Sequence, residues 1–384
     1  MSIYFDNAAT SSPKPPEVVE AVVQALTRFN ANPGRSGQRA AIEAGRIVLD
    51  ARERLQALIG AEDPSCVIFA FNCTDALNLA IKGTLRFGDH AIATRLDHNS
   101  VLRPLSELAA RGRIGLTLID PRPDGFVDPA DVAAAVRANT RLIVMPHASN
   151  VTGAIQPVAA VGQIARERGV RYLIDGAQAL GALPVNVRAL RCDLYAFPGH
   201  KSLLGPQGTG GLYVRPGDEL STLREGGTGS ASDSMLQPKE LPDRYESGTL
   251  NLPGIAGLGA GCAHVAGRLS QIVSHERELT GAIREGLFKI EGVEIYSPAE
   301  EVACTGIVCF NVGDLSSSEA ADALARAGIA VRGGLHCAPG AHRFLGTLLR
   351  GAVRASVSAA NTFEEVEAFL RTVREISVDS AATG

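Results

Sequence analysis

The strongest constraint on the fold of this chain is a regular alternation, through its first half, of short apolar runs with segments in which apolar residues recur every three to four positions. The apolar runs predict strands at 66–70, 90–96, 114–119, 142–145 and 171–174. The periodic segments between them predict helices at 74–82, 101–111, 129–138 and 158–168. Such alternation predicts an α/β fold with a mostly parallel sheet covered by helices on both faces.

The rhythm changes after this region, where two predicted strands follow each other without a helix between them. Strands at 194–197 and 211–214 are separated by a glycine-rich turn, which predicts a hairpin. A Gly/Ser-rich stretch and a Pro- and charge-rich stretch then predict long loops over 225–243. Loops of that length without secondary structure are usually functional or mobile.

A length of 384 residues predicts two domains, because single hydrophobic cores stop growing near roughly 250 to 300 residues. We expect a large domain over 1–252 and a smaller one over 253–384, with an N-terminal arm, 1–15, packed on the smaller domain. The smaller domain is predicted to contain helices near 255–272, 274–290 and 317–327, and strands at 293–296, 306–312, 329–332 and 352–357. A last helix is predicted after Thr362, because Thr362 and Glu365 have the spacing of a capping box.

Charge and composition exclude several classes of partner. The formal net charge is −4 and the basic residues are scattered singly, so nucleic acid is not an expected partner. No apolar run reaches the roughly 18 residues of a membrane span, and the first residues lack a leader pattern, so we expect no membrane contact and a cytoplasmic location. Seven cysteines without a C-x-x-C pair argue against a disulfide framework or a metal site.

Lys201 is the first candidate for chemistry, because it follows a predicted strand and lies between Gly199 and Gly205, where the backbone must approach something closely. Such a lysine can present its amine to an aldehyde, although a surface lysine in a turn is the alternative reading. Asp175 ends another buried strand, and ligands of open α/β sheets collect at the carboxyl ends of strands. Asp175 alone is equally compatible with a turn cap.

A candidate phosphate site lies at 72–76, where a strand gives way to a helix. The free N–H groups at a helix N-terminus bind anions, and the Thr74 hydroxyl would add a donor, although an ordinary N-cap remains the alternative. Cys337 is flanked by Gly333-Gly334 and Pro339-Gly340, which predict an irregular, exposed loop. A small core residue is the alternative for Cys337, since most free cysteines are buried.

The motifs resemble those of the class-V aminotransferase family of pyridoxal-5′-phosphate (PLP) enzymes, specifically its cysteine desulfurase and selenocysteine lyase branch. They include D-G-A-Q at 175–178, G-H-K at 199–201 and R-G-G-L-H-C at 332–337. The other motifs lie at 4–10, 32–36, 97–98, 149–150, 246–249 and 354–356. Nine motifs in the family's order span nearly the whole chain, and imply the PLP-dependent transferase fold, which is aspartate aminotransferase-like.

The resemblance implies a cofactor site. Lys201 would bind PLP as a Schiff base, Asp175 would pair with its pyridine nitrogen, and Gln178 would hydrogen-bond its phenolic oxygen. His98 would stack on the ring and move protons. The remaining contacts implied are Cys73, Asn150, the phosphate-binding Thr74 and His200, and Thr249 from a second subunit.

The resemblance also implies the reaction. L-cysteine would become L-alanine, with its sulfur passed to Cys337 as a persulfide, because only a thiolate is nucleophilic enough for that step. Arg354 would clamp the substrate carboxylate with its bidentate fork, and Asn150 and Arg35 would lie near the substrate. A homodimer, a sulfur-acceptor protein and sulfur mobilisation for iron–sulfur cluster assembly are implied as well.

The sequence departs from the family pattern at a few positions, and it is also compatible with other functions. Pro198 stands where a Ser or Thr is common and cannot donate to phosphate, and Asn99 and Ser100 also differ from the commonest pattern. His336 is either a spacer or an aid to ionisation of Cys337. The nearest alternative is a selenocysteine lyase, or another class-V PLP lyase or aminotransferase in which Cys337 does not accept sulfur.

Two further alternatives come from other classes. A dinucleotide-binding oxidoreductase would use the glycine-rich stretch 205–210, but these glycines do not follow the first strand and open a helix as a phosphate fingerprint does. A catalytically silent sulfur-carrier or assembly partner is disfavoured by the intact Lys201, Asp175, His98 and Arg354.

Overall fold

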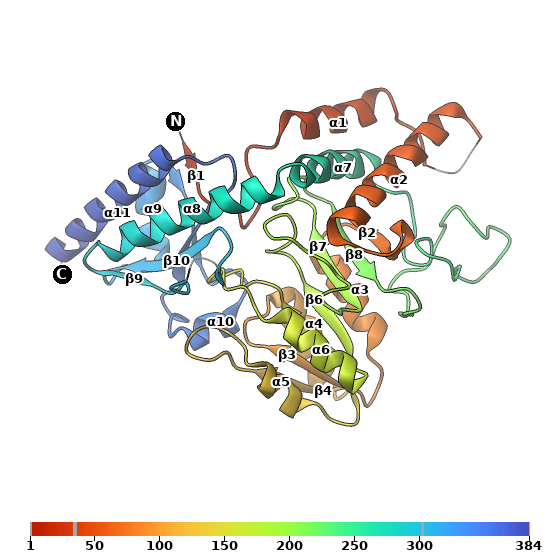
Figure 1. The fold of residues 1–384 in the computed structure, drawn as a ribbon, viewed down its shortest axis with the longest axis horizontal. Coiled ribbons are helices and arrows are strands. Elements are labelled where there is room, and N and C mark those ends of the chain that lie inside the picture. The colour runs from red at the N-terminus through yellow and green to blue at the C-terminus, as the bar shows by residue number, and fades with distance from the viewer. Residues whose placement is uncertain (1, 34–36, 301–302, 384) are drawn as a thin grey trace.

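The structure is a computed structural model of the chain and describes residues 2–33, 37–300 and 303–383. Figure 1 shows a large central sheet with helices on both faces, and a smaller sheet, built by the C-terminal part of the chain, to one side. Among the described residues, no helix combines the length and the apolar character that crossing a membrane requires.

The large sheet has seven strands in the order β2-β8-β7-β6-β5-β3-β4. Its strands are β2 (Val67–Ala70), β3 (His90–Thr94), β4 (Gly115–Ile119), β5 (Thr140–Pro146), β6 (Arg171–Asp175), β7 (Leu194–Pro198) and β8 (Gly210–Val214). Only β8 runs against its neighbours, β2 and β7, and the other pairings are parallel. The mostly parallel sheet and the β7–β8 hairpin are therefore confirmed.

Alternate side chains of each strand point to opposite faces of this sheet. Both faces are buried, because helices pack on each of them. Tyr195 and Phe197 of β7 pack in one core, and Leu194 and Ala196 pack in the other. The first core is shared with α2 (Arg39–Ile59), α5 (Pro129–Ala135), α6 (Val158–Arg168) and α7 (Leu252–Ala266). The second is shared with α3 (Cys73–Thr84) and α4 (Asn99–Ala110). Helix α1 (Pro16–Thr27) packs on α7, and a short 3₁₀ turn, Pro64–Cys66, precedes β2.

The smaller sheet is antiparallel, in the order β12-β13-β10-β9. Its strands are β9 (Val293–Ile295), β10 (Ile307–Val312), β12 (Arg332–Gly334) and β13 (Ala352–Ser356). The helices of this part are α8 (Leu269–Phe288), α9 (Ser317–Arg326), α10 (Pro339–Phe344) and α11 (Phe363–Thr383). Phe310 and Phe369 pack edge to face with ring centroids 5.8 Å apart, which anchors α11 on the sheet.

The N-terminal segment crosses to this smaller part of the structure. Strand β1 (Ile3–Tyr4) pairs in parallel with β11 (Ile329–Ala330) in a separate two-stranded sheet, and the Phe5 ring lies 5.5 Å from that of Phe369. The buried side chains of α7, in contrast, belong to a core of the large sheet. The division of the chain at residue 252 stays a prediction.

Several predicted elements have different bounds in the structure. The predicted strand 329–332 is two strands, because β11 pairs with β1 while β12 pairs with β13. The predicted helix 255–272 begins at Leu252, where the Asn251 side chain accepts from the Gly254 amide, and it ends at Ala266. The predicted helix 101–111 begins at Asn99, and 129–138 ends at Ala135, since Val136 is extended. Helices α1, α2 and α10 were not predicted.

Candidate active site

A cavity of about 230 Å³ lies where the carboxyl edge of the large sheet meets the segments that contain Arg332, Cys337 and Arg354. Nearly all residues predicted for chemistry line it. They are Cys73, Thr74, His98, Asn150, Asp175, Gln178, His200, Lys201, Cys337 and Arg354. Thr249 instead lines a separate cavity of about 40 Å³, and Arg35 lies outside the described residues.

Lys201 lies in the loop between β7 and β8, which two glycines fold tightly. A Cβ on Gly199 would lie 2.1 Å from Thr209 Oγ1, and one on Gly205 would lie 2.9 Å from the Gly199 carbonyl oxygen. Both positions therefore require glycine. Burial lowers the pKa of Lys201 to about 8, and Arg354 acts in the same direction while Asp175 opposes it. About half of the amine is thus neutral at mildly alkaline pH, near pH 8.

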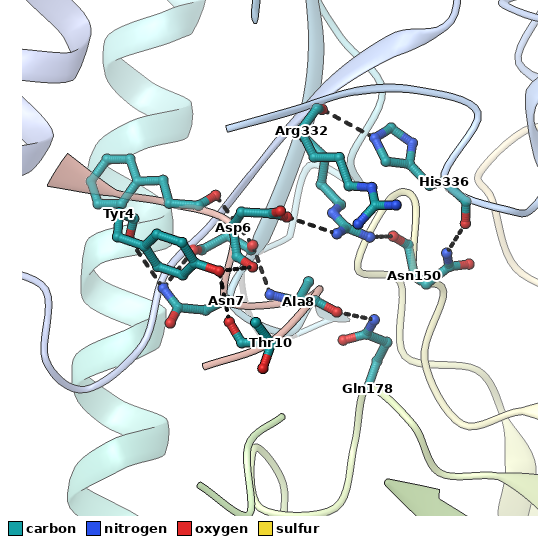
Figure 2. Close-up of polar contacts among 12 residues, drawn as sticks. Tyr4, Asp6, Asn7, Ala8, Thr10, Asn150, Gln178, Arg332 and His336 are labelled. Atoms are coloured by element: carbon teal, nitrogen blue, oxygen red, sulfur yellow. Dashed lines mark hydrogen bonds and ion pairs between the residues drawn. The ribbon is translucent and has the colours of Figure 1, made fainter. Parts of the chain in front are cut away.

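Asp175 ends β6 beside this lysine. Its Oδ1 accepts from the Ala177 amide at 3.0 Å and from the Cys73 thiol at 3.5 Å. The turn that follows also requires glycine, because a Cβ on Gly176 would lie 2.2 Å from the Tyr195 ring. Gln178 closes this side of the cavity by donating from Nε2 to the Ala8 carbonyl at 3.1 Å, and Figure 2 shows the N-terminal segment lying against it.

His98 and Thr74 are joined through Ser100. The Ser100 hydroxyl lies 2.7 Å from Thr74 Oγ1 and 2.9 Å from His98 Nδ1. The Ser100 amide donates to the same Nδ1 at 3.0 Å, so His98 is the N-cap of α4 and carries its proton on Nε2. Burial lowers the pKa of His98, which favours this neutral form. Sequence reasoning treated Ser100 only as a departure from a pattern and missed this link.

The cavity has the features of an anion site at one end. Thr74 lies in the first turn of α3, whose N-cap is Asn72. His200 Nδ1 is buried and has no hydrogen-bond partner among the residues that the structure describes. A phosphate group would give this nitrogen a partner and would face the helix N-terminus. Pro198 lies on the same wall and offers no N–H, so the other groups must supply the donors.

Arg354 joins three separate segments. Its Nη1 donates to the Asn150 carbonyl at 2.8 Å, and its Nη2 donates to Asp6 Oδ1 at 3.1 Å. Its Nε is buried without a partner in the described part of the chain. Burial lowers the pKa of Arg354, and Asp6 opposes the shift. Sequence reasoning assigned no role to Asp6, since a contact across 348 residues has no local signal.

Cys337 is the exposed member of the seven cysteines, and the other six are buried. Its carbonyl accepts from the Asn99 amide at 2.7 Å, and the neighbouring His336 carbonyl accepts from Asn150 Nδ2 at 2.6 Å (Figure 2). Burial raises the pKa of Cys66 and Cys304 to about 11, which leaves those thiols protonated. The predicted exposure of the Cys337 loop is confirmed.

The chain is similar to known proteins over nearly its whole length. It is 35% identical to a probable cysteine desulfurase of Methanothermobacter thermautotrophicus, over 98% of this chain and 94% of that protein. It is 31% identical to a cysteine desulfurase of Escherichia coli, over 97% and 93% of the two chains. The apo structure of a cysteine desulfurase from Thermococcus onnurineus matches with a TM-score of 0.92 and 34% identity, over 98% and 95%.

The family comparison agrees with these similarities. The sequence profile described as aminotransferase class-V matches residues 3–369, which include every described residue of the cavity. The resemblance inferred from the nine motifs and the expected fold are confirmed. This chain belongs to the class-V aminotransferase family.

Proposed function

We propose that this protein is a PLP-dependent cysteine desulfurase, which converts L-cysteine to L-alanine and receives the sulfur on Cys337 as a persulfide. The observation that carries the proposal is that one cavity contains both an amine with a lowered pKa, Lys201, and the exposed thiol of Cys337. An enzyme that passes the sulfur of an amino acid to its own cysteine needs both groups. The names of the relatives support the same reaction.

The residues of the cavity fit the cofactor that the family uses. Lys201 would hold PLP covalently, and Asp175 would pair with its pyridine nitrogen. The remaining contacts we propose are Gln178 to the phenolic oxygen, Thr74 and His200 to the phosphate, His98 against the ring, and Cys73 and Asn150 beside it. When bound, the cofactor supplies an electron sink for negative charge that develops at the substrate Cα.

Lys201 is proposed to be the base. A neutral amine accepts a proton, and burial makes the neutral form accessible by lowering the pKa to about 8. Lys201 Nζ therefore takes the proton from the substrate Cα and returns it when the product forms. His98, neutral and protonated on Nε2, can move a second proton at the opposite end of the reacting group.

Arg354 is proposed to bind the substrate carboxylate. Its guanidinium is buried, and Asp6 and the Asn150 carbonyl hold two of its nitrogens. Its remaining N–H groups can donate to a carboxylate in the cavity. Arg35 is proposed to lie near the substrate as well.

Cys337 is proposed to accept the sulfur. Its Sγ forms a bond to the substrate sulfur while the bond from that sulfur to Cβ breaks. The balance is L-cysteine plus the Cys337 thiol giving L-alanine plus the Cys337 persulfide, with no external oxidant or reductant. Because the thiol is exposed, the terminal sulfur can pass to an acceptor protein, and we propose a role in sulfur mobilisation such as iron–sulfur cluster assembly.

The test is the substitution Cys337→Ala, with Cys66→Ala as the matched control of a buried cysteine. Cys337→Ala should abolish sulfide release from L-cysteine with a thiol reductant present, while the yellow cofactor colour stays. Reduction with borohydride should then leave a pyridoxyl adduct on Lys201, found by peptide mass analysis. Sulfide release that survives Cys337→Ala would instead indicate a lyase in which this thiol has no part, such as a selenocysteine lyase.

We also propose that the protein is a cytoplasmic homodimer. Val19, Val23 and Leu26 are about half exposed on α1, and Met235 and Leu236 are almost fully exposed in the loop between β8 and α7. Exposed apolar side chains of this kind are typical of an interface. A second copy on this surface would bring Thr249 to the neighbouring cofactor site. Light scattering should give twice the chain mass, and a fully active monomer would contradict the dimer.

A further inference from the structure

The segment that carries Cys337 has a backbone that is costly to maintain. His336 has a φ of 50° and Cys337 has a φ of 55°, so two successive residues with side chains are in the left-handed region. Each such residue is disfavoured by contact between its Cβ and the backbone. A conformation of this kind persists only where the surroundings hold it in place.

Main-chain contacts hold the segment on one side. The His336 carbonyl accepts from Asn150 Nδ2, and the Cys337 carbonyl accepts from the Asn99 amide. Both donors come from the part of the chain that forms the large sheet and its helices. These two bonds fix the carbonyl groups but leave the His336 side chain to be held by other residues.

The His336 ring is held by a chain of hydrogen bonds on the opposite side. His336 Nε2 lies 3.2 Å from the Arg332 carbonyl oxygen, and His336 Nδ1 lies 3.1 Å from His342 Nε2. His342 Nδ1 lies 2.8 Å from Thr347 Oγ1. The two rings are stacked at 5.3 Å, and His342 and Thr347 are almost fully buried. None of these side chains belongs to the proposed reaction.

The donor and the acceptor of each hydrogen bond in this series follow from its last acceptor, the Arg332 carbonyl oxygen. A carbonyl oxygen cannot donate, so His336 Nε2 must carry a proton toward Arg332. Burial, with the charged Arg354 and Arg332 facing the ring, lowers the pKa of His336 to about 3, so at neutral pH its Nδ1 is bare and accepts. Burial lowers the pKa of His342 to about 4. His342 therefore donates from Nε2, and its bare Nδ1 accepts from the Thr347 hydroxyl.

We propose that this one-way hydrogen-bond chain, from Thr347 through His342 and His336 to the Arg332 carbonyl, positions Cys337 for sulfur transfer. The inference rests on the proposed function in naming Cys337 as the sulfur acceptor. His342 and Thr347 are positioning residues that act through His336. The chain ends on β12, whose Arg332 is paired with Arg354 of β13, so it sets the thiol relative to the arginine proposed to bind substrate.

The Thr347 hydroxyl is the element that can be removed with least disturbance. Thr347→Val keeps the shape of the side chain and the backbone bond from the Thr347 amide to the His342 carbonyl at 2.9 Å. It leaves His342 Nδ1 buried without a donor, which costs about as much as one lost hydrogen bond. If the His342 proton moved to Nδ1 instead, His336 would have to donate from Nδ1 and would present a bare Nε2 to a carbonyl.

The experiment compares Thr347→Val with Thr347→Ser, which keeps the hydroxyl, in the full chain with its cofactor. Nitrogen-15 NMR of histidine-labelled wild type should show both rings neutral and protonated on Nε2 at pH 7, with signals assigned from His336→Gln and His342→Gln. Amide hydrogen exchange in the peptide that contains Cys337 should be about fivefold faster in Thr347→Val and unchanged in Thr347→Ser. A peptide from α9 serves as the internal reference.

Sulfide release gives the functional measurement. Thr347→Val should lower kcat about fivefold with KM unchanged, because Arg354 is untouched, and Thr347→Ser should restore it. A ring protonated on Nδ1 at pH 7, or wild-type exchange and kcat in Thr347→Val, would overturn the inference. Failure of the proposed function would give a different result. Cys337→Ala would then still release sulfide, while the exchange and NMR results would be as expected.

Discussion

The Lys201 side of the cavity is made of strand ends and glycine turns of a seven-stranded sheet, whereas the Cys337 side is a short segment, with an exposed thiol, between a three-residue strand and a six-residue helix. The first side partly buries its reactive amine and lowers the pKa of that amine, and the second leaves its thiol open to solvent. The difference follows from the proposed chemistry. Proton transfer benefits from a dry site, while a sulfur that must leave the protein needs an open one.

The largest effect is expected from removal of the Lys201 amine. Lys201→Ala should lower sulfide release about a thousandfold, because the base is gone and the cofactor is no longer held covalently. The rate at which iodoacetamide alkylates Cys337 should change little in the same variant, if the Lys201 side and the Cys337 side of the cavity are built independently. Lys82→Ala, in the last turn of α3, is the control. A large change in the alkylation rate of Lys201→Ala would break the comparison.

Arg354 spans both sides and should give the next largest effect. Arg354→Lys keeps a positive charge but loses the planar fork, so kcat/KM for L-cysteine should fall about a hundredfold. Most of the fall should appear in KM, since the arginine is proposed to bind the substrate carboxylate. Arg371→Lys, on the exposed face of α11, should leave both constants unchanged. An unchanged KM in Arg354→Lys would remove Arg354 from substrate binding.

The lowered pKa of Lys201 should also appear in stability. Between about pH 8 and pH 10.5 the unfolded chain keeps a lysine proton that the folded chain has lost, so this group makes the folded state more stable as pH rises. We compare wild type with Lys201→Met, both without cofactor. The free energy of unfolding of wild type minus that of the variant should increase by up to about 1.4 kcal/mol per pH unit in this range. Denaturant titrations at several pH values measure it. A constant difference would mean an ordinary, exposed amine.

The smallest effect concerns Ser100, which links Thr74 to His98 on the sheet side. Ser100→Ala should lower kcat about five- to tenfold, because His98 loses its hydroxyl partner and keeps only the amide. Ser106→Ala, at an exposed position of the same helix, should have no effect. If Ser100→Ala instead weakened only cofactor binding, the hydroxyl would serve Thr74 rather than His98.

The local parts of the fold could be predicted from the sequence. The capping box at the start of α11 is formed, with the Thr362 amide 3.0 Å from Glu365 Oε2 and the Glu365 amide 3.3 Å from Thr362 Oγ1. The β7–β8 hairpin and the exposed cysteine loop also follow from short-range signals. Helix α1 was missed although its apolar residues share one broad face, of which Val18 is buried while Val19 and Val23 are exposed.

The contacts that complete the site could not be predicted in this way. Asp6 accepts a hydrogen bond from Arg354, and the Ala8 carbonyl accepts one from Gln178. Both contacts depend on the pairing of β1 with β11, which places the N-terminal segment beside the cavity. Residues 329–332 read as one strand, yet Val331 separates β11 from β12, which belong to different sheets. Such pairings depend on the whole packing and leave no pattern in the neighbouring residues.

The burial of six cysteines beside one open thiol has a consequence for how preparations of the protein age in air. Oxidation needs an accessible, ionisable sulfur, so sulfenic and then sulfinic acid should build up at position 337 while the other six stay reduced. The sulfinic form is not recovered by thiol reductants. An old sample would thus keep its fold and its colour yet lose turnover, and intact mass would reveal the cause more directly than a melting curve.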